Sequence, residues 1–287
     1  MSRRSTGVIW IVLSAAGFGA MAIFAKLAYR DGVSLSTMLF LRFAIAGTLL
    51  AAWGVATRMP WPRGRDLALL IAMGAVGYVG QSFSYFSALQ HASAGLVAML
   101  LYLYPAIVTL LSALLFRRPV GFGRAAAVAA ALAGTALAVG GDLYSEPIGI
   151  VLGVAAALIY SVYILVGEGV MSRVGSLPAA TVVMLAAAAA YGVAAGVSGL
   201  ALPQSATGWA AVLAIAVFST LLAILGFFKG LERLGAADAS TLSAMEPMIT
   251  LGLAALVLGE SMTLTQLLGG GLILAAVIYL ARRPAMA

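Results

Sequence analysis

The sequence predicts an all-α membrane protein: ten transmembrane helices arranged as two inverted five-helix repeats, with the N- and C-termini in the cytoplasm. Three observations predict this fold, namely the scarcity of charge, the spacing of the uncharged stretches and the distribution of the cations. Of the 287 residues, 63% are hydrophobic and 9% are charged, whereas a soluble domain carries about 25% charged residues. This composition excludes a soluble enzyme, a disordered chain and a nucleic-acid-binding protein.

The uncharged stretches determine the number of spans. A helix needs about 20 apolar residues to cross a bilayer. The segment from Val174 to Phe228 has 55 residues without a charge, so it must hold two helices, separated at the polar segment 202–208. We interpret the first apolar run as a span and not as a cleaved signal peptide, because it continues to Ala25. The predicted spans are 6–28, 35–57, 67–89, 94–116, 121–140, 148–170, 177–199, 208–230, 238–258 and 263–282.

The cations predict the orientation. Lysine and arginine concentrate on the cytoplasmic side of membrane proteins. With a cytoplasmic N-terminus, 13 of the 16 cations fall in inner segments, among them Arg117 and Arg118, and two (Lys26 and Arg30) fall outside, with Arg42 inside a span. The net charge of +7 is therefore explained by the excess of cations on the cytoplasmic side. We expect the protein to lie in a bacterial-type inner membrane.

An internal repeat appears when the chain is shifted by 142 residues. Gly7 then meets Gly149, Ser34 meets Ser176 and Pro105 meets Pro247. The first repeat covers 1–145 and the second covers 146–287. Because five spans is an odd number, the second repeat must enter the membrane from the opposite side, as in many secondary transporters.

Polar residues inside the spans are candidate site residues, because they are costly in lipid and tend to face a cavity or another helix. Tyr78, Gln81, Ser82 and Tyr85 lie on one helical face of span three. This face could line a substrate cavity, or it could pack against another helix. The other predicted substrate-binding residues are Met99, Tyr102, Tyr160, Tyr163, Ser219 and Met245.

Four residues have two interpretations each. Pro105 and Pro247 could be hinges or static kinks. Glu246 could bind a proton or a substrate ammonium group, or it could be a structural carboxylate. Arg42 could pair with a substrate carboxylate, or with a buried acid or backbone carbonyls.

The remaining titratable groups do not predict a chemical centre. Lys26 and Glu168 are expected to mark span ends by snorkelling, and His91 is expected to be a solvated loop residue. There is no cysteine and only one histidine, so we expect neither a metal site nor a cofactor. No nucleophile and base occur together, so we expect no catalytic residues and no enzymatic activity.

The C-terminal spans carry a motif. Glu246-Pro247, Gly259-Glu260 and the glycines 269–271 resemble the pattern of the EamA family in the drug/metabolite transporter superfamily. The first half has a degenerate copy, in which Tyr104-Pro105 is followed by two arginines in place of Gly-Glu. Within the family, the chain is most similar to YddG-type amino-acid exporters.

The resemblance and the layout imply a secondary transporter that exports amino acids and related small amphipathic metabolites by alternating access. The expected partners are the small-molecule substrate and the lipid bilayer, with no nucleic acid, and we expect a monomer. Alternative cargoes are organic cations or drugs, and phosphorylated metabolites or nucleotide sugars. A non-transporting membrane subunit is the alternative from another functional class.

Overall fold

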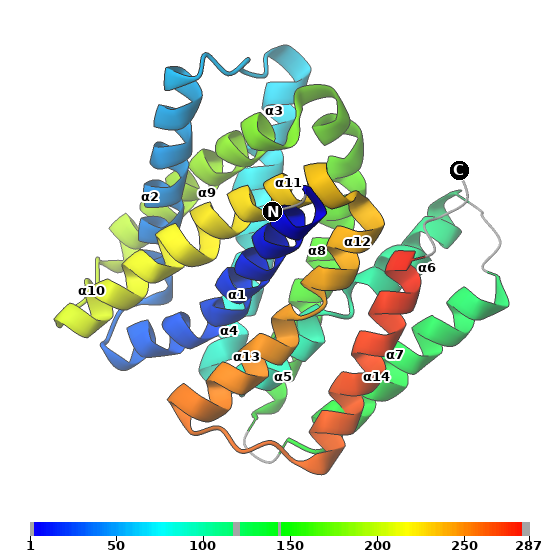
Figure 1. Cartoon of the computed structure of the whole chain (residues 1–287). Coiled ribbons are helices and arrows are strands. Elements are labelled where there is room, and N and C mark those ends of the chain that lie inside the picture. The colour runs from blue at the N-terminus through cyan, green and yellow to red at the C-terminus, as the bar shows by residue number, and fades with distance from the viewer. Residues whose placement is uncertain (1–2, 117–120, 143–144, 283–287) are drawn as a thin grey trace.

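The computed structural model describes residues 3–116, 121–142 and 145–282, which form helices joined by short connections (Figure 1). Arg117 and Arg118, which entered the orientation argument, lie outside the described residues. The first half contains α1 (Arg3–Arg30), α2 (Leu35–Ala56), α3 (Gly64–Ala72), η1 (Met73–Tyr78), α4 (Val79–His91), α5 (Ala94–Leu101), α6 (Tyr104–Phe116) and α7 (Phe122–Gly140). The second half contains α8 (Pro147–Val174), α9 (Ser176–Ser198), α10 (Ala206–Leu213), η2 (Ala214–Leu222), α11 (Ala223–Leu234), α12 (Ala236–Ser243), α13 (Glu246–Leu253), η3 (Ala254–Leu258) and α14 (Leu264–Arg282).

The ten predicted spans are confirmed within the described residues. Ten helical stretches are long and apolar enough to cross a membrane. Spans three, four, eight and nine are each built from two or three consecutive helical elements. Several spans are longer than predicted, such as 64–91 in place of 67–89. The prediction stopped near the first charge or polar turn, whereas backbone hydrogen bonding continues through charged residues whose side chains can reach the interface.

Four spans are irregular at matching positions. Span three widens into the π-helix η1, and span eight widens into the π-helix η2, which contains the positions 142 residues after those of η1. Span four is interrupted at Tyr102 and Leu103, and span nine at Ala244 and Met245, again 142 residues later. A π-helical turn or a broken helix is costly to maintain and often marks a functional site.

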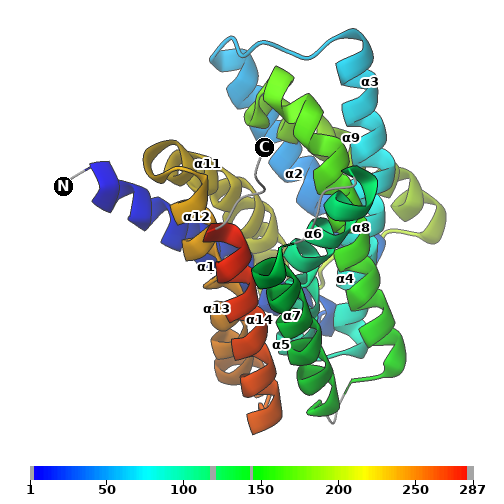
Figure 2. The same ribbon diagram turned by 90° about the vertical axis from the view of Figure 1, so that its right-hand side faces the viewer.

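The helices pair across the two halves. The main pairs are α1 with α11, α2 with α9, α4 with α8 and α7 with α14, and Figure 2 shows α7 beside α14 from a second direction. Small residues allow these close approaches, as is usual between membrane helices. On α1, Gly7 and Gly17 face side chains or backbone of span eight, and the Ser14 hydroxyl donates to the Ala223 carbonyl at 2.7 Å.

The contact between α7 and α14 gives the first prediction. A Cβ atom on Gly134 would lie 2.6 Å from the Gly269 carbonyl oxygen, whereas a Cβ on Gly271 meets nothing within 4 Å. Gly134→Ala should therefore separate the two helices at a cost of about 1–3 kcal/mol. We expect it to lower the thermal unfolding temperature in detergent by several degrees. Gly271→Ala, on the same helix pair, is the control and should leave that temperature unchanged or raise it, since alanine favours helix. Equal effects of the two changes would contradict this packing.

Candidate functional site

Aromatic side chains from both halves meet where the spans are irregular. The ring centroids of Tyr78 and Tyr163 are 5.7 Å apart, and those of Tyr163 and Tyr160 are 6.2 Å apart. The row continues from Tyr160 to Tyr104 at 5.0 Å and from Tyr104 to Tyr102 at 6.1 Å. At its other end, Phe43 contacts Tyr78 at 5.3 Å and Tyr191 at 5.8 Å. We call these seven residues the aromatic row.

The breaks in the helices position this row. Tyr102 lies in the interruption of span four, and its hydroxyl donates to the carbonyl of Ser243, next to the interruption of span nine, at 2.9 Å. The Tyr102 hydroxyl also interacts electrostatically with the Glu246 carboxylate. The aromatic row therefore ends at the point where the two broken spans meet. Tyr78, Tyr104, Tyr160 and Tyr163 are partly exposed, and the other three are buried.

Hydroxyl groups complete the hydrogen bonding at the π-helices. Tyr191 donates to the Val79 carbonyl at 2.9 Å, and Ser82 donates to the Tyr78 carbonyl at 2.6 Å. The two hydroxyl groups are 3.0 Å apart. In span eight, Thr220 donates to the Ile215 carbonyl at 2.8 Å. These side chains satisfy carbonyl groups at the wide turns, as lipid requires.

Two buried hydroxyl groups lack a partner. Among the buried side-chain polar atoms of the described residues, those without a hydrogen bond are the oxygens of Ser219 in η2 and Ser243 at the end of α12. A buried polar group without a partner costs about 1–3 kcal/mol and needs an explanation. Both hydroxyl groups lie at irregular parts of spans, where a polar ligand could form the missing hydrogen bonds.

The structure brings together some of the predicted substrate-binding residues and not others. Tyr78, Tyr102, Tyr160 and Tyr163 are members of the aromatic row. Gln81, Ser82 and Tyr85 are buried on the next turns of span three, and Tyr85 interacts electrostatically with both Arg42 and Glu246. Met99 lies apart, buried against Gly270 of α14, and the Met245 side chain is 42% exposed at the interruption of span nine.

Sequence reasoning missed three members of the row, Phe43, Tyr104 and Tyr191. Tyr191 follows five consecutive alanines in span seven. A single large aromatic residue in such a stretch was a signal that could have been used. Phe43 carried no signal of its own, because an isolated phenylalanine in an apolar span is ordinary.

The two prolines begin helices. Pro105 and Pro247 are the second residues of α6 and α13, where a missing N–H costs nothing. The interruptions are the two residues before each of these helices. The candidate hinge or static kink therefore corresponds to the residue pairs 102–103 and 244–245, and each proline begins the helix that follows.

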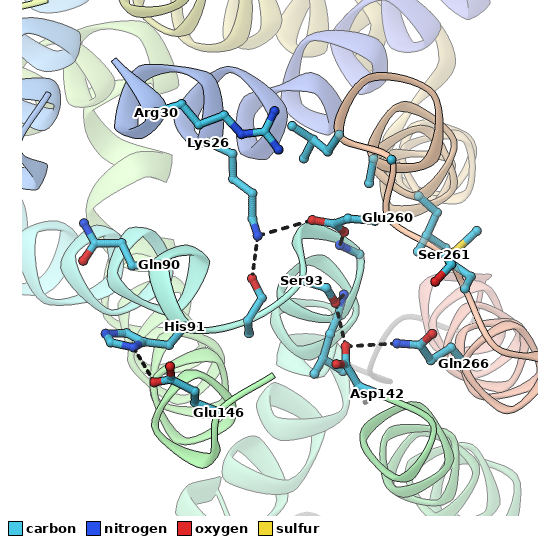
Figure 3. Close-up of a pocket in the computed structure, with 18 residues that line it drawn as sticks. Lys26, Arg30, Gln90, His91, Ser93, Asp142, Glu146, Glu260, Ser261 and Gln266 are labelled. Atoms are coloured by element: carbon cyan, nitrogen blue, oxygen red, sulfur yellow. Dashed lines mark hydrogen bonds and ion pairs between the residues drawn. The ribbon is translucent and has the colours of Figure 1, made fainter. Parts of the chain in front are cut away.

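A second group of polar residues lies at one end of the bundle, around a cavity of about 490 Å³ (Figure 3). We call it the polar cluster: Lys26, His91, Ser93, Asp142, Glu146, Glu260 and Gln266. Asp142 accepts from the Ser93 hydroxyl at 2.6 Å and from the Gln266 amide at 3.0 Å, and His91 bonds Glu146 at 2.8 Å. The cluster ties together the ends of seven spans.

Glu260 is the centre of the polar cluster. Its carboxylate accepts the backbone N–H groups of Ala94 and Gly95 at 3.0 and 3.3 Å, and it pairs with Lys26 at 3.3 Å. It thus meets the positive end of α5, where an anion is favoured. Gly259 allows this position, since it ends η3 with a φ of +71°, which suits glycine. In this pair, Gly259 therefore provides the turn and Glu260 caps the N-terminus of α5 from a span that is distant in the sequence.

Two expectations change here. Lys26 does not only mark a span end by snorkelling, because it binds Glu260 and donates to the Ala92 carbonyl at 2.8 Å. His91 is not a free loop residue, because it holds Glu146. Sequence separation concealed both contacts. In the described part of the chain, no group of three His, Cys, Asp or Glu side chains could hold a metal.

Comparison with known proteins identifies the family. The profile of the EamA-like transporter family matches residues 5–140 and, a second time, residues 147–282. The chain belongs to the EamA-like transporter family. It is a multi-pass membrane transporter.

The chain is similar to two transporters and to one solved structure. The chain is 28% identical to "Uncharacterized transporter YcbK" of Bacillus subtilis (strain 168) over 93% of this chain and 90% of that protein. It is 23% identical to an "Uncharacterized transporter" of Archaeoglobus fulgidus over 96% and 99% of the two chains. A solved crystal structure, 22% identical, matches the fold with a TM-score of 0.68 over 96% of both chains.

The second prediction concerns Glu260. Glu260→Gln removes the ion pair and weakens the cap on α5, which costs about 1 kcal/mol. A loss of this size should increase about fivefold the fraction of molecules in which the polar cluster has separated. Because the chain has no cysteine, Leu251→Cys, which lines the cavity and is 3% exposed, gives a clean readout. A charged maleimide should label it about five times faster with Glu260→Gln than without.

The control for this labelling is Glu146→Gln. Glu146 pairs with His91 at the rim, where its side chain is 64% exposed, so the pair should contribute little. Equal labelling rates in the parent and in the Glu260→Gln protein would show that Glu260 does not hold this end closed.

Proposed function

We propose that this EamA protein is a secondary transporter that exports amino acids and related small amphipathic metabolites by alternating access. The observation that carries the proposal is the aromatic row, because both halves contribute to it at the irregular parts of spans. Aromatic and hydroxyl groups can hold the apolar body and the polar ends of a small solute. Weak, shape-based contacts of this kind predict a broad substrate range.

We further infer that residues 1–145 and 146–287 are inverted repeats. Three observations support this: the family profile matches twice with an offset of 142 residues, η1 and the interruption of span four recur at the same offset, and equivalent helices such as α7 and α14 run in opposite directions in Figure 1. Inverted repeats place the substrate between the halves and allow access from either side in turn.

The orientation follows from the predicted cytoplasmic termini, which would place the polar cluster on the outer side of a bacterial-type inner membrane. In this arrangement the polar cluster is the barrier between the aromatic row and the exterior. It must separate during export, and Lys26 and Glu260 are the charges that part. The sequence contains no phosphate-binding loop, so a solute or ion gradient would supply the energy.

The third prediction tests the activity. Purified protein in liposomes preloaded with unlabelled phenylalanine or leucine should accumulate the labelled amino acid by saturable counterflow. The same assay with organic cations, phosphate esters and nucleotide sugars separates the alternative cargoes. Absence of counterflow with every amino acid, while another class is transported, would reject the proposed substrate class.

The fourth prediction tests the aromatic row. Tyr163→Leu removes the ring that contacts both Tyr78 and Tyr160. Each of these two ring contacts is worth about 0.5–1.5 kcal/mol. We expect at least a fivefold loss in the counterflow rate of phenylalanine, with Tyr163→Phe retaining most of the rate. Phe83→Leu is the control, because Phe83 is half exposed and outside the row. A normal rate with Tyr163→Leu would exclude the row from the transport path.

Glu246 is the candidate for proton coupling, since it lies within a span beside Tyr102. We expect an imposed pH gradient to accelerate transport by the parent protein and not by Glu246→Gln. Counterflow needs no net gradient and should survive in both. The same gradient response in both proteins would make Glu246 a structural carboxylate.

A further inference from the structure

Arg42 is a buried cation inside the membrane span α2. Its exposed fraction is 3%, and it is the one lysine or arginine among the described residues that is buried. It lies seven residues after the start of α2, which corresponds to about 10 Å along the helix. A charge at this depth is expensive and is a functional candidate by default.

The neighbours of Arg42 are hydroxyl groups and aromatic rings. Its Nε donates to the Thr220 hydroxyl at 2.9 Å, and its guanidinium interacts electrostatically with Tyr78. The guanidinium carbon is 4.7 Å from the ring centroid of Phe43 and 5.1 Å from that of Phe86. Thr220 and Tyr78 belong to the two π-helices, so Arg42 lies between the wide turns of both halves.

No carboxylate neutralises Arg42. All nine acidic residues of the chain are described by the structure. The ion pairs formed in the described part of the chain are Arg4–Asp238, Lys26–Glu260, His91–Glu146 and Arg173–Asp66. Of the interpretations open from the sequence, a buried acid is excluded for the described residues, and within these residues the Arg42 side chain contacts the Thr220 hydroxyl and the Phe43 and Phe86 rings, not a backbone carbonyl.

The charge of Arg42 is therefore only partly compensated. Burying an ion carries a desolvation cost that relaxation does not remove, and cation–π contacts with aromatic rings offset only part of it. A guanidinium carries five N–H donors in a planar fork that fits a carboxylate. Thr220 uses Nε, which leaves the terminal nitrogens beside the Phe43–Tyr78 end of the aromatic row.

We propose that Arg42 binds the carboxylate of the transported molecule and thereby selects carboxylate-bearing solutes over otherwise identical neutral or cationic ones. This inference rests on the proposed function and narrows its substrate class. The apolar part of the solute would lie along the aromatic row, starting at Tyr78. Binding of the carboxylate gives the buried guanidinium the counter-ion that the chain does not provide.

The test compares phenylalanine with phenylalanine amide, which has the same ring and ammonium group but no carboxylate. Inhibition of counterflow by each compound gives an acid-to-amide preference. We expect the parent protein to prefer the acid at least tenfold and Arg42→Gln to prefer it less than threefold. Arg42→Lys keeps the charge without the fork and should fall between them. An unchanged preference in Arg42→Gln would overturn the proposal.

A purely structural role for Arg42, bridging the wide turns, needs its own control. Thr220→Val removes the hydroxyl contact and keeps the cation. We expect it to lower the unfolding temperature while retaining the acid preference. If Thr220→Val loses the preference as fully as Arg42→Gln, Arg42 acts only through the turns and the proposal fails.

A binding measurement separates this inference from the proposed function. The shift in unfolding temperature caused by saturating phenylalanine or its amide is recorded in detergent, without transport. A larger shift with the acid in the parent protein, reduced in Arg42→Lys and absent in Arg42→Gln, supports the carboxylate site even if liposomes show no counterflow. Equal shifts with acid and amide in the parent protein would reject Arg42 as a carboxylate site, even if amino acids are transported.

Discussion

Backbone polar groups within a bilayer must find their hydrogen-bond partners inside the protein, and the irregular parts of this structure depend on that constraint. Where spans three and eight widen, the freed carbonyls accept from Ser82, Tyr191 and Thr220. Where span four is interrupted, Tyr102 donates to the backbone of span nine. The polar side chains of the candidate site are therefore located where the helices depart from regular geometry, and the two features support each other.

Charge is divided between the end and the centre of the bundle. At one end, Lys26 and Glu260 satisfy each other and also the start of α5. In the centre, Arg42 and Glu246 are apart, and Tyr85 interacts with both. Paired charges can hold two parts of a protein together, whereas an unpaired central charge is available to a solute. Basic and acidic side chains thus suit a barrier where they are paired, in the polar cluster, and a binding site where they are separate, in the centre of the bundle.

Much of the fold was predictable from the sequence, and less of the site. The ten spans followed from hydropathy and length, since a bilayer imposes both. Tyr78 and Tyr163 were candidates because each shares a helical face with other polar or aromatic residues, and their role in transport stays a prediction. The capping of α5 by Glu260, the neighbours of Arg42 and the burial of Met99 against α14 depend on contacts between distant spans. No periodicity within one helix records such contacts, so these features required the three-dimensional structure.

The π-helices have a consequence for the symmetry of the binding region. A π turn adds one residue to an α-helix without altering the rest of the span. η1 and η2 contain equivalent positions of two halves that match the same family profile. In the inverted repeat that we propose, the wide turn is therefore a feature that the two halves share. Arg42 has Met184 at its equivalent position, so the buried cation is a feature of one half alone, and any solute that it binds must meet two chemically different halves.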